Sequence, residues 1–214
     1  MKRVLLTSDV HGSGHFVKMI RALRKSFDFA LICGDVLPKH GWDFKDLSRR
    51  QELWFEKVFL PLMDEINGYF ILGNDDWVDY DGERKLEGKV EIEGVRIFAY
   101  EYVPPTGMKT NREKSEEDIY LDLKDVEVEK PFIFVTHAPP KGILDEARGE
   151  NLGSLSIRSF ALRKKPIVHC FGHIHESFGN IYMKGIRFVN ASFEIDMRFY
   201  LLEISKGNHN LFFV

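Results

Sequence analysis

The stretch Val4-Leu5-Leu6-Thr7-Ser8-Asp9-Val10-His11-Gly12 decides the fold. An apolar run with strand character passes directly into a carboxylate, an imidazole and a glycine. The same succession recurs further along the chain: residues 29–33 precede Gly34-Asp35, residues 69–72 precede Gly73-Asn74-Asp75-Asp76, residues 132–135 precede Thr136-His137-Ala138-Pro139, and residues 167–171 precede Gly172-His173-Ile174-His175. Because the carboxyl ends of the strands of an open α/β sheet face one crevice, we expect these polar groups to meet in space.

Helical patterns separate the early strands. Residues 15–25 and 46–66 carry apolar side chains at helical spacing, and Pro61 is expected to bend the second helix or to end it early. Continuous apolar strands between helices indicate a sheet that is buried on both faces.

The second half of the chain is richer in strand signals. We expect a hairpin over residues 90–102 around Gly94, followed by a polar loop and short helix over residues 106–118 that could form a mobile flap. A helix is expected over residues 155–164. Four short strands are expected over residues 178–214, with turns at Gly185, near Glu194 and at Gly207-Asn208. No linker rich in proline, glycine or serine separates the halves. We therefore predict one domain, residues 1–214, with two packed sheets.

Composition excludes several classes of protein. With 214 residues, 44% hydrophobic and 13% aromatic, the chain can bury a sizeable core without disulfides. Only two cysteines occur, Cys33 and Cys170, which excludes a secreted disulfide scaffold. A net charge of −3 gives no support to nucleic acid as a partner. The apolar runs are too short for a signal peptide or a membrane span, so we expect a cytoplasmic protein without membrane contact.

The polar groups at the strand ends suit metal ions. Together they offer two carboxylates, four imidazoles and one carboxamide, nearly twice what one ion needs. Nitrogen and oxygen donors without a thiolate suit Mn, Fe, Zn, Ni or Co. The set predicts a hydrolytic site with two metals.

The ordered motifs D-x-H, G-D, G-N, H and G-H-x-H resemble those of the calcineurin-like metallophosphoesterases. The resemblance extends from Asp9 to His175, and residues 136–140 and 172–176 look most like the small prokaryotic branch of predicted phosphoesterases. Any one motif alone would be weak, whereas five in this order are specific.

The resemblance implies an α/β fold, a four-layer α-β-β-α sandwich of two mixed sheets flanked by helices. It also implies two divalent ions, with Mn favoured, and a small phosphate ester as substrate. A hydroxide between the ions would attack phosphorus in line. The implied ligands are Asp9, His11 and His175 for the first metal, Asp35 as the bridge, and Asn74, His137 and His173 for the second. Asn74 and His137 are also expected to take part in catalysis.

One position departs from the family pattern. Asp75 follows Gly73-Asn74 where the family often has a histidine that contacts the phosphate and assists the leaving group. A carboxyl beside two dications should be ionised, so it would donate protons poorly and would repel a dianionic monoester more than a monoanionic diester. We therefore expect Asp75 to act with Asn74 on substrate and to favour phosphodiesters.

Weaker candidates lie elsewhere. His15 opens a predicted helix and could touch substrate. Arg158, with the hydroxyls and helix amides that precede it, could face a phosphate, although an ordinary helix capped by serine is the better-supported interpretation. His169 is expected to be a packed imidazole and Trp77 a core residue, and the sequon Asn190-Ala191-Ser192 carries no meaning in a cytosolic chain.

One alternative class of function remains: a noncatalytic, metal-binding scaffold of the same fold that binds a protein partner. A nuclease would be the same phosphoesterase acting on another substrate, and it would need a local basic patch (Arg49, Arg50, Arg163, Lys164, Lys165). The oligomeric state is also open, because the aromatic segment of residues 211–214 could pair as a strand or cover an interface.

Overall fold

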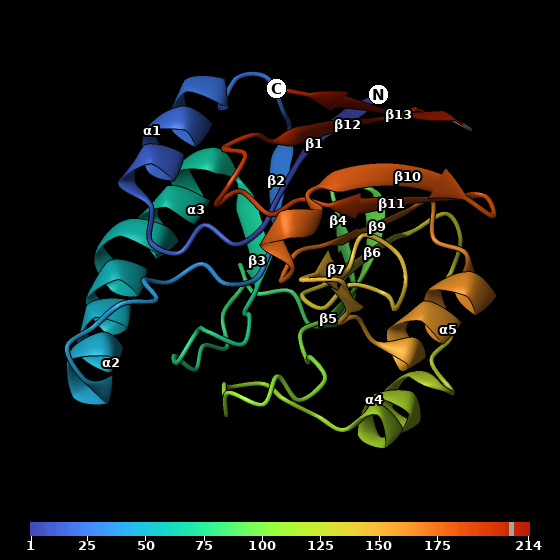
Figure 1. Cartoon of the computed structure of the whole chain (residues 1–214). Helices are drawn as coiled ribbons and strands as arrows, with labels where there is room; N and C mark the ends of the chain where they lie inside the picture. The colour runs from blue at the N-terminus through green and yellow to red at the C-terminus, as the bar shows by residue number, and fades with distance from the viewer. Residues whose placement is uncertain (206–207) are drawn as a thin grey trace.

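Two β-sheets pack face to face between two layers of helices in the computed structural model (Figure 1). The structure describes residues 1–205 and 208–214, and for Asn208 it describes the backbone only. The expected four-layer α-β-β-α arrangement is therefore confirmed. Gly207, in the predicted turn at Gly207-Asn208, lies outside the described residues.

The first sheet has five strands in the order β13-β12-β1-β2-β3. Its parallel centre consists of β1 (Lys2–Thr7), β2 (Phe29–Cys33) and β3 (Gly68–Ile71). Strands β12 (Tyr200–Ser205) and β13 (Asn208–Phe213) extend it with antiparallel pairing. The end of the chain thereby returns to lie beside its first strand.

The second sheet has six strands in the order β10-β11-β9-β6-β5-β4. Its parallel centre is formed by β5 (Val95–Tyr100), β6 (Ile133–Thr136), β9 (Val168–Phe171) and β11 (Ile186–Asn190). The antiparallel edges are β4 (Gly88–Ile92) and β10 (Gly179–Met183). A separate small hairpin joins β7 (Glu146–Ala147) to β8 (Glu150–Asn151).

Helices cover the outer face of each sheet. Helix α1 (Gly14–Leu23) and a long helix made of α2 (Phe44–Trp54), the π-helical segment η1 (Phe55–Phe59) and α3 (Leu60–Ile66) pack on the first sheet. Helices α4 (Glu116–Leu123) and α5 (Leu155–Lys164) pack on the second. A 3-10 turn, η2 (His175–Ser177), follows β9.

Pro61 does not end the long helix. The turn before it widens into η1, in which the Leu60 amide donates to Phe55 O, five residues back. The helix thus passes through a residue that has no N–H group to donate. It ends at Asn67, whose φ of 52° breaks the helical path.

Three apolar clusters hold the layers together: one under each helical layer and one between the sheets. The middle cluster contains Cys33 of β2 and Cys170 of β9, both buried, with their sulfur atoms 3.2 Å apart. Both cysteines serve as small buried residues, as expected. His169 is also buried and packed, stacking on Phe134 and bonding to Thr136 Oγ1 at 2.9 Å.

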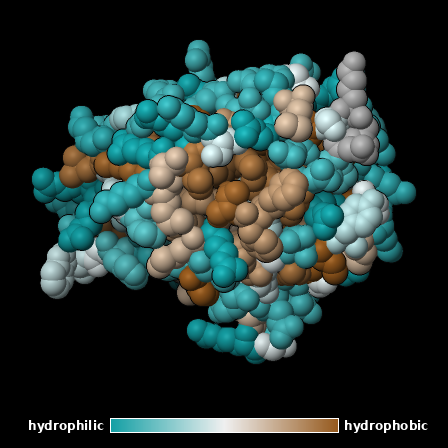
Figure 2. All heavy atoms as spheres, turned by 90° about the horizontal axis from the view of Figure 1, so that it is seen from above, coloured by the Kyte–Doolittle hydropathy of each residue, from teal (hydrophilic) through white to brown (hydrophobic). Residues whose placement is uncertain are grey.

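Apolar side chains gather on the face seen from above in Figure 2, over the end of the molecule where β13, β12 and β10 lie in Figure 1. The two edge strands there, β10 and β13, expose the large apolar side chains Ile181, Tyr182, Phe212 and Phe213. Within residues 1–205 and 208–214, none of the helices has the length and apolar character needed to span a membrane.

Candidate metal centre

The carboxyl ends of the strands from both sheets meet at one place. The Ser8 amide, just after β1, donates to Ala191 O, just after β11, and the Phe193 amide, also after β11, donates to Ser8 O. These backbone bonds tie the two sheets together where the polar groups follow the strands. The predicted crevice therefore forms between the sheets and not along one of them.

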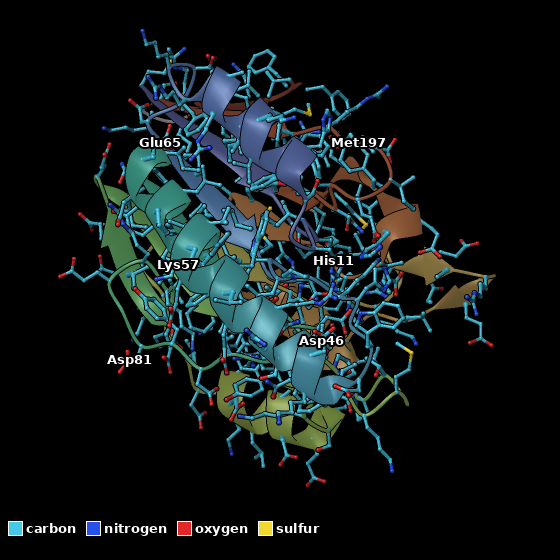
Figure 3. All side chains as sticks on the ribbon, turned by 90° about the vertical axis from the view of Figure 1, so that its left-hand side faces the viewer. His11, Asp46, Lys57, Glu65, Asp81 and Met197 are labelled. Atoms are coloured by element: carbon cyan, nitrogen blue, oxygen red, sulfur yellow. The ribbon has the colours of Figure 1, made fainter. Side chains whose placement is uncertain are left out.

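Asp9, His11 and His175 form a first group. One ligand atom from each lies within 4.8 Å of the others. His175 Nε2 is 3.2 Å from Asp9 Oδ1 and 3.4 Å from His11 Nε2. In Figure 3, His11 is labelled between Met197 and Asp46, beside the end of the long helix that carries Asp46.

Asp35, His137 and His173 form a second group with the same spacing. His137 Nε2 lies 3.4 Å from Asp35 Oδ2 and 3.1 Å from Asn74 Oδ1, so the carboxamide joins this group. Four of the donors are almost fully buried: Asp9, Asp35, Asn74 and His137.

The two groups adjoin at Asp35. Its Oδ2 is 3.9 Å from His11 Nε2, which belongs to the first group, and His11, Asp35 and Asp75 themselves satisfy the same 4.8 Å criterion. The structure therefore brings together every residue that the sequence proposed as a ligand, with Asp35 between the two groups.

Hydrogen bonds orient two of the imidazoles. His137 Nδ1 lies 2.7 Å from Cys33 O, so it carries the proton and leaves Nε2 directed at Asp35 and Asn74. His175 Nδ1 lies 2.6 Å from Glu194 Oε2, which leaves its Nε2 directed at Asp9. Such backing is usual for histidines that bind metals. The buried oxygen and nitrogen donors, aimed at common points, fit divalent cations.

The backbone of the site is strained. Asp9, His11, Asp35 and His173 have φ of 53°, 43°, 52° and 69°, a region that residues with a Cβ rarely adopt. Such conformations cost about 1–3 kcal/mol each and persist where the surroundings impose them. The strain that directs these side chains inward therefore lowers the free energy of unfolding, and the rest of the fold offsets it.

Glycine is required beside the buried carboxylate of the first group. A Cβ on Gly172 would lie 2.0 Å from Asp9 Oδ2, and Asp9 is held by Ser192 Oγ at 2.7 Å and by the His173 amide. We expect Gly172→Ala to displace Asp9 and to weaken Mn²⁺ binding at least about tenfold, measured by calorimetry on protein whose circular dichroism is native. The control is Gly14→Ala, where a Cβ meets nothing within 4 Å. Equal Mn²⁺ affinity in both variants would contradict this placement of Asp9.

The charges of Asp35 and His137 stabilise one another. Burial alone would raise the pKa of Asp35, but His137 outweighs it and lowers that pKa to about 2. Burial would likewise lower the pKa of His137, but the carboxylates of Asp35 and Asp9 raise it to about 10. The pKa of Asp9 is also lowered, since His175 and its neighbours overcome burial.

The raised pKa of His137 predicts how metal binding depends on pH. At neutral pH the imidazole holds a proton that a cation must displace, so low pH opposes binding and high pH favours it. Between pH 6 and pH 8 we expect the Mn²⁺ association constant to rise by up to about tenfold per pH unit. Calorimetry in buffers of different ionisation enthalpy should detect at least one released proton, and an affinity independent of pH would refute the assignment.

Asp75 lies at the mouth of the site and Asp76 beneath it. The Asp75 amide donates to Asp35 Oδ1 at 2.9 Å, and burial together with the Asp35 charge raises the pKa of Asp75 to about 6. Asp76 is fully buried and accepts amide hydrogens from Gly73, Val36 and Leu37. It therefore joins the loops after β2 and β3, a structural role that the sequence did not indicate.

Two residues that support the ligands were missed. Glu194 bonds to His175 and pairs with Lys39, and Ser192 bonds to Asp9. Ser192 belongs to the sequon that the sequence analysis set aside. Both follow β11, so the rule that polar residues at strand ends converge would have found them had it been applied to this strand as well.

The proposed substrate residues His15 and Arg158 are not brought to the metal centre. His15 is exposed on α1, and Arg158 donates to Lys141 O at 2.8 Å. The amides that open α5 are already occupied: Ser154 caps the helix, and Glu116 accepts from the amides of Leu155 and Ser156. The capped-helix interpretation of the Arg158 segment is the one that fits, because no free amide faces a phosphate there.

The predicted flap begins against the site. The Asn111 amide donates to Asn74 O, and Asn111 Nδ2 donates to Asp76 O at 3.1 Å. Arg112 contacts Asp76 O and Val78 O through its guanidinium. The loop is thus docked on the Asn74 turn, and its mobility stays a prediction.

Comparisons with known proteins agree with this geometry. The family model of the calcineurin-like phosphoesterases matches residues 2–177. The chain is 29% identical over 126 residues to UPF0046 protein K07C11.7 of Caenorhabditis elegans, covering 59% of this chain and 40% of that protein. It is 29% identical over 110 residues to metallophosphoesterase domain-containing protein 1 of Homo sapiens, covering 50% of this chain and 33% of that protein.

The chain therefore spans less than half the length of these relatives. A solved structure of a dimetal phosphatase from Danio rerio superimposes with a TM-score of 0.64 at 9% identity, over 99% of this chain and 95% of that one, which shows a shared fold. Because the family model covers most of the sequence and the residues of its motifs converge in one pocket, the chain belongs to the calcineurin-like phosphoesterase family.

Proposed function

We propose that this chain is a binuclear metal-dependent phosphodiesterase. The observation that carries the proposal is the pair of adjoining donor groups that share Asp35. When bound there, divalent cations supply Lewis acidity: they polarise the phosphoryl group and lower the pKa of an attacking water.

The protein's own groups prepare this chemistry. Glu194 and Cys33 O fix the directions in which His175 and His137 present Nε2. Asn74 Nδ2 donates to Asp75 Oδ1 at 3.2 Å, so the carboxamide and the carboxylate form one polar edge that a phosphoryl oxygen would approach. The buried ligands exclude bulk water from one side of the centre, which strengthens every charge interaction with the ester.

Asp75 supports the preference for diesters. It stands in the position that a histidine often fills in the family, and its carboxylate lies with His11 and Asp35 around one point. A second carboxylate at this point repels a dianionic monoester more than a monoanionic diester.

The donors are nitrogen and oxygen without sulfur, which suit Mn, Fe, Zn, Ni or Co, and among these manganese is the proposed metal because the resemblance to the family favours it. The cytoplasm is the proposed location, because a chain with only two cysteines, Cys33 and Cys170, both in buried apolar strands, is not a secreted disulfide scaffold. The alternative, a noncatalytic scaffold, finds no specific support, since every proposed ligand is in place.

The test is hydrolysis of bis(p-nitrophenyl) phosphate and p-nitrophenyl phosphate by protein stripped of metal and then titrated with Mn²⁺. We expect no turnover after stripping, recovery with Mn²⁺, and a higher kcat/KM for the diester. Absence of turnover at saturating Mn²⁺ would favour the scaffold, and faster monoester hydrolysis would refute the preference for diesters.

A further inference from the structure

Two hollows adjoin the candidate metal centre, one beside each donor group. The hollow beside His11 has a volume of about 230 Å³ and contains the ion pair of Lys39 and Glu194. The hollow beside His173 is larger, about 460 Å³, and its walls are mainly apolar. A phosphoester held at the metals would therefore meet a small charged recess on one side and a roomier apolar pocket on the other.

The larger hollow, here called the Met108–Leu152 pocket, lies between two separate segments. One wall comes from Pro104, Pro105 and Met108 in the chain between β5 and α4, and the facing wall comes from Leu152 just after β8. Ile174, which separates the two histidines of the G-H-x-H motif, also lines the pocket.

Two large apolar side chains of this pocket, one from each wall, are left uncovered. Met108 is 74% exposed and Leu152 is 45% exposed. Exposed apolar groups around a hollow of several hundred Å³ that adjoins a reactive centre are typical of a site for the organic part of a ligand. The charged residues at its edge are Arg148, Glu150 and Glu176, one cation against two carboxylates, so a second anionic group would not be favoured there.

Both walls are supported from behind. In the first wall, Glu113 accepts from Thr106 and Thr110, and the Val103 amide donates to Arg112 O. In the second wall, buried Asp145 accepts from Gly142, Gly153 and Asn151. The pocket is thus built by the fold before a ligand arrives, which lowers the entropic cost of binding.

We propose that the Met108–Leu152 pocket binds a large uncharged apolar substituent of the ester whose phosphorus lies at the metal centre. The inference rests on the proposed function and adds a substrate class: esters with one large apolar arm, for which an aryl group serves as the probe. The pocket makes no covalent contribution, so it sets specificity through the affinity for that arm.

The first experiment compares two diesters with the same leaving group, bis(p-nitrophenyl) phosphate and methyl p-nitrophenyl phosphate, in Mn²⁺. Leu152→Asp and Met108→Asp place a charge in opposite walls. We expect each to lower the ratio of kcat/KM for the aryl ester to that for the methyl ester at least about tenfold, mainly through KM. The matched control is Leu53→Asp on α2, a leucine 50% exposed, which should keep the wild-type ratio.

The second experiment separates this inference from the proposed function. Calorimetry measures phenylphosphonate and methylphosphonate binding to the protein loaded with Mn²⁺, with no reaction required. The inference is supported if the wild type binds phenylphosphonate more tightly than methylphosphonate and if Leu152→Asp and Met108→Asp both abolish that preference. This result would support the pocket even if no ester is hydrolysed. Equal binding of the two phosphonates, or a preference that both variants retain, would overturn the inference even if diesters are hydrolysed.

Discussion

Asp35→Asn is expected to reduce the kcat for phosphodiester hydrolysis at least about 10³-fold, because the carboxylate that lies between the two donor groups becomes a neutral amide. The change keeps the size of the side chain, and the amide oxygen can still accept from the Asp75 amide as Asp35 Oδ1 does. The change removes the negative charge of Asp35. In the wild type, Oδ2 of this carboxylate lies 3.4 Å from His137 Nε2 and 3.9 Å from His11 Nε2. Loss of activity with native circular dichroism would then report the loss of that charge and not of the fold.

The control for this variant is Asp122→Asn, a carboxylate outside the centre that bonds to Lys114 and Tyr100. It should leave kcat within about twofold. The steady-state rates of both variants at saturating Mn²⁺ are the measurement. Wild-type turnover in Asp35→Asn would show that the charge of Asp35 is not needed for the reaction.

Asp75 provides the second large effect, on the choice of substrate. In Asp75→His, the negative charge beside Asp35 and His11 is replaced by a group that can donate a proton to a leaving oxygen. We expect the ratio of kcat/KM for p-nitrophenyl phosphate to that for bis(p-nitrophenyl) phosphate to rise at least about tenfold. Asp75→Asn should shift the ratio in the same direction, because removal of the charge alone relieves repulsion of the dianion.

Asp79→Asn is the matched control, since Asp79 lies on the same loop and is fully exposed. Its ratio should equal that of the wild type. An unchanged ratio in both Asp75 variants would show that this carboxylate does not select between esters.

Much of the fold was predictable because each buried strand is a continuous apolar run that ends in polar residues. Thr7, Cys33 and Phe171 mark such ends, and the Asp or His that follows each of them falls in the centre. Within each sheet the proposed ligands converge because parallel strands direct their carboxyl ends to a common edge. The meeting of the two edges at one crevice depends on how the sheets pack, through bonds such as that from the Ser8 amide to Ala191 O, and the strand pattern alone does not predict it.

The remaining features depend on contacts between distant segments. The position of Glu194 after a strand predicts that it faces the crevice, but its pairing with His175 requires that β11 lie beside β9, and the local sequence does not indicate that register. Occupation of the α5 N-terminus by Glu116 depends on the packing of α4 against α5. The left-handed backbone of Asp9 and His11 is imposed by bonds such as that from the Asp9 amide to Gly34 O, which only the assembled sheet provides.

The most direct measurement is the number of Mn²⁺ ions bound per chain, taken by elemental analysis after equilibrium dialysis and supported by the spin coupling of the two ions in electron paramagnetic resonance. Two coupled ions in the wild type, and one or none in Asp35→Asn, are the predicted result. A single uncoupled ion in the wild type, or two coupled ions retained in the variant, would contradict a pair of cations joined through Asp35.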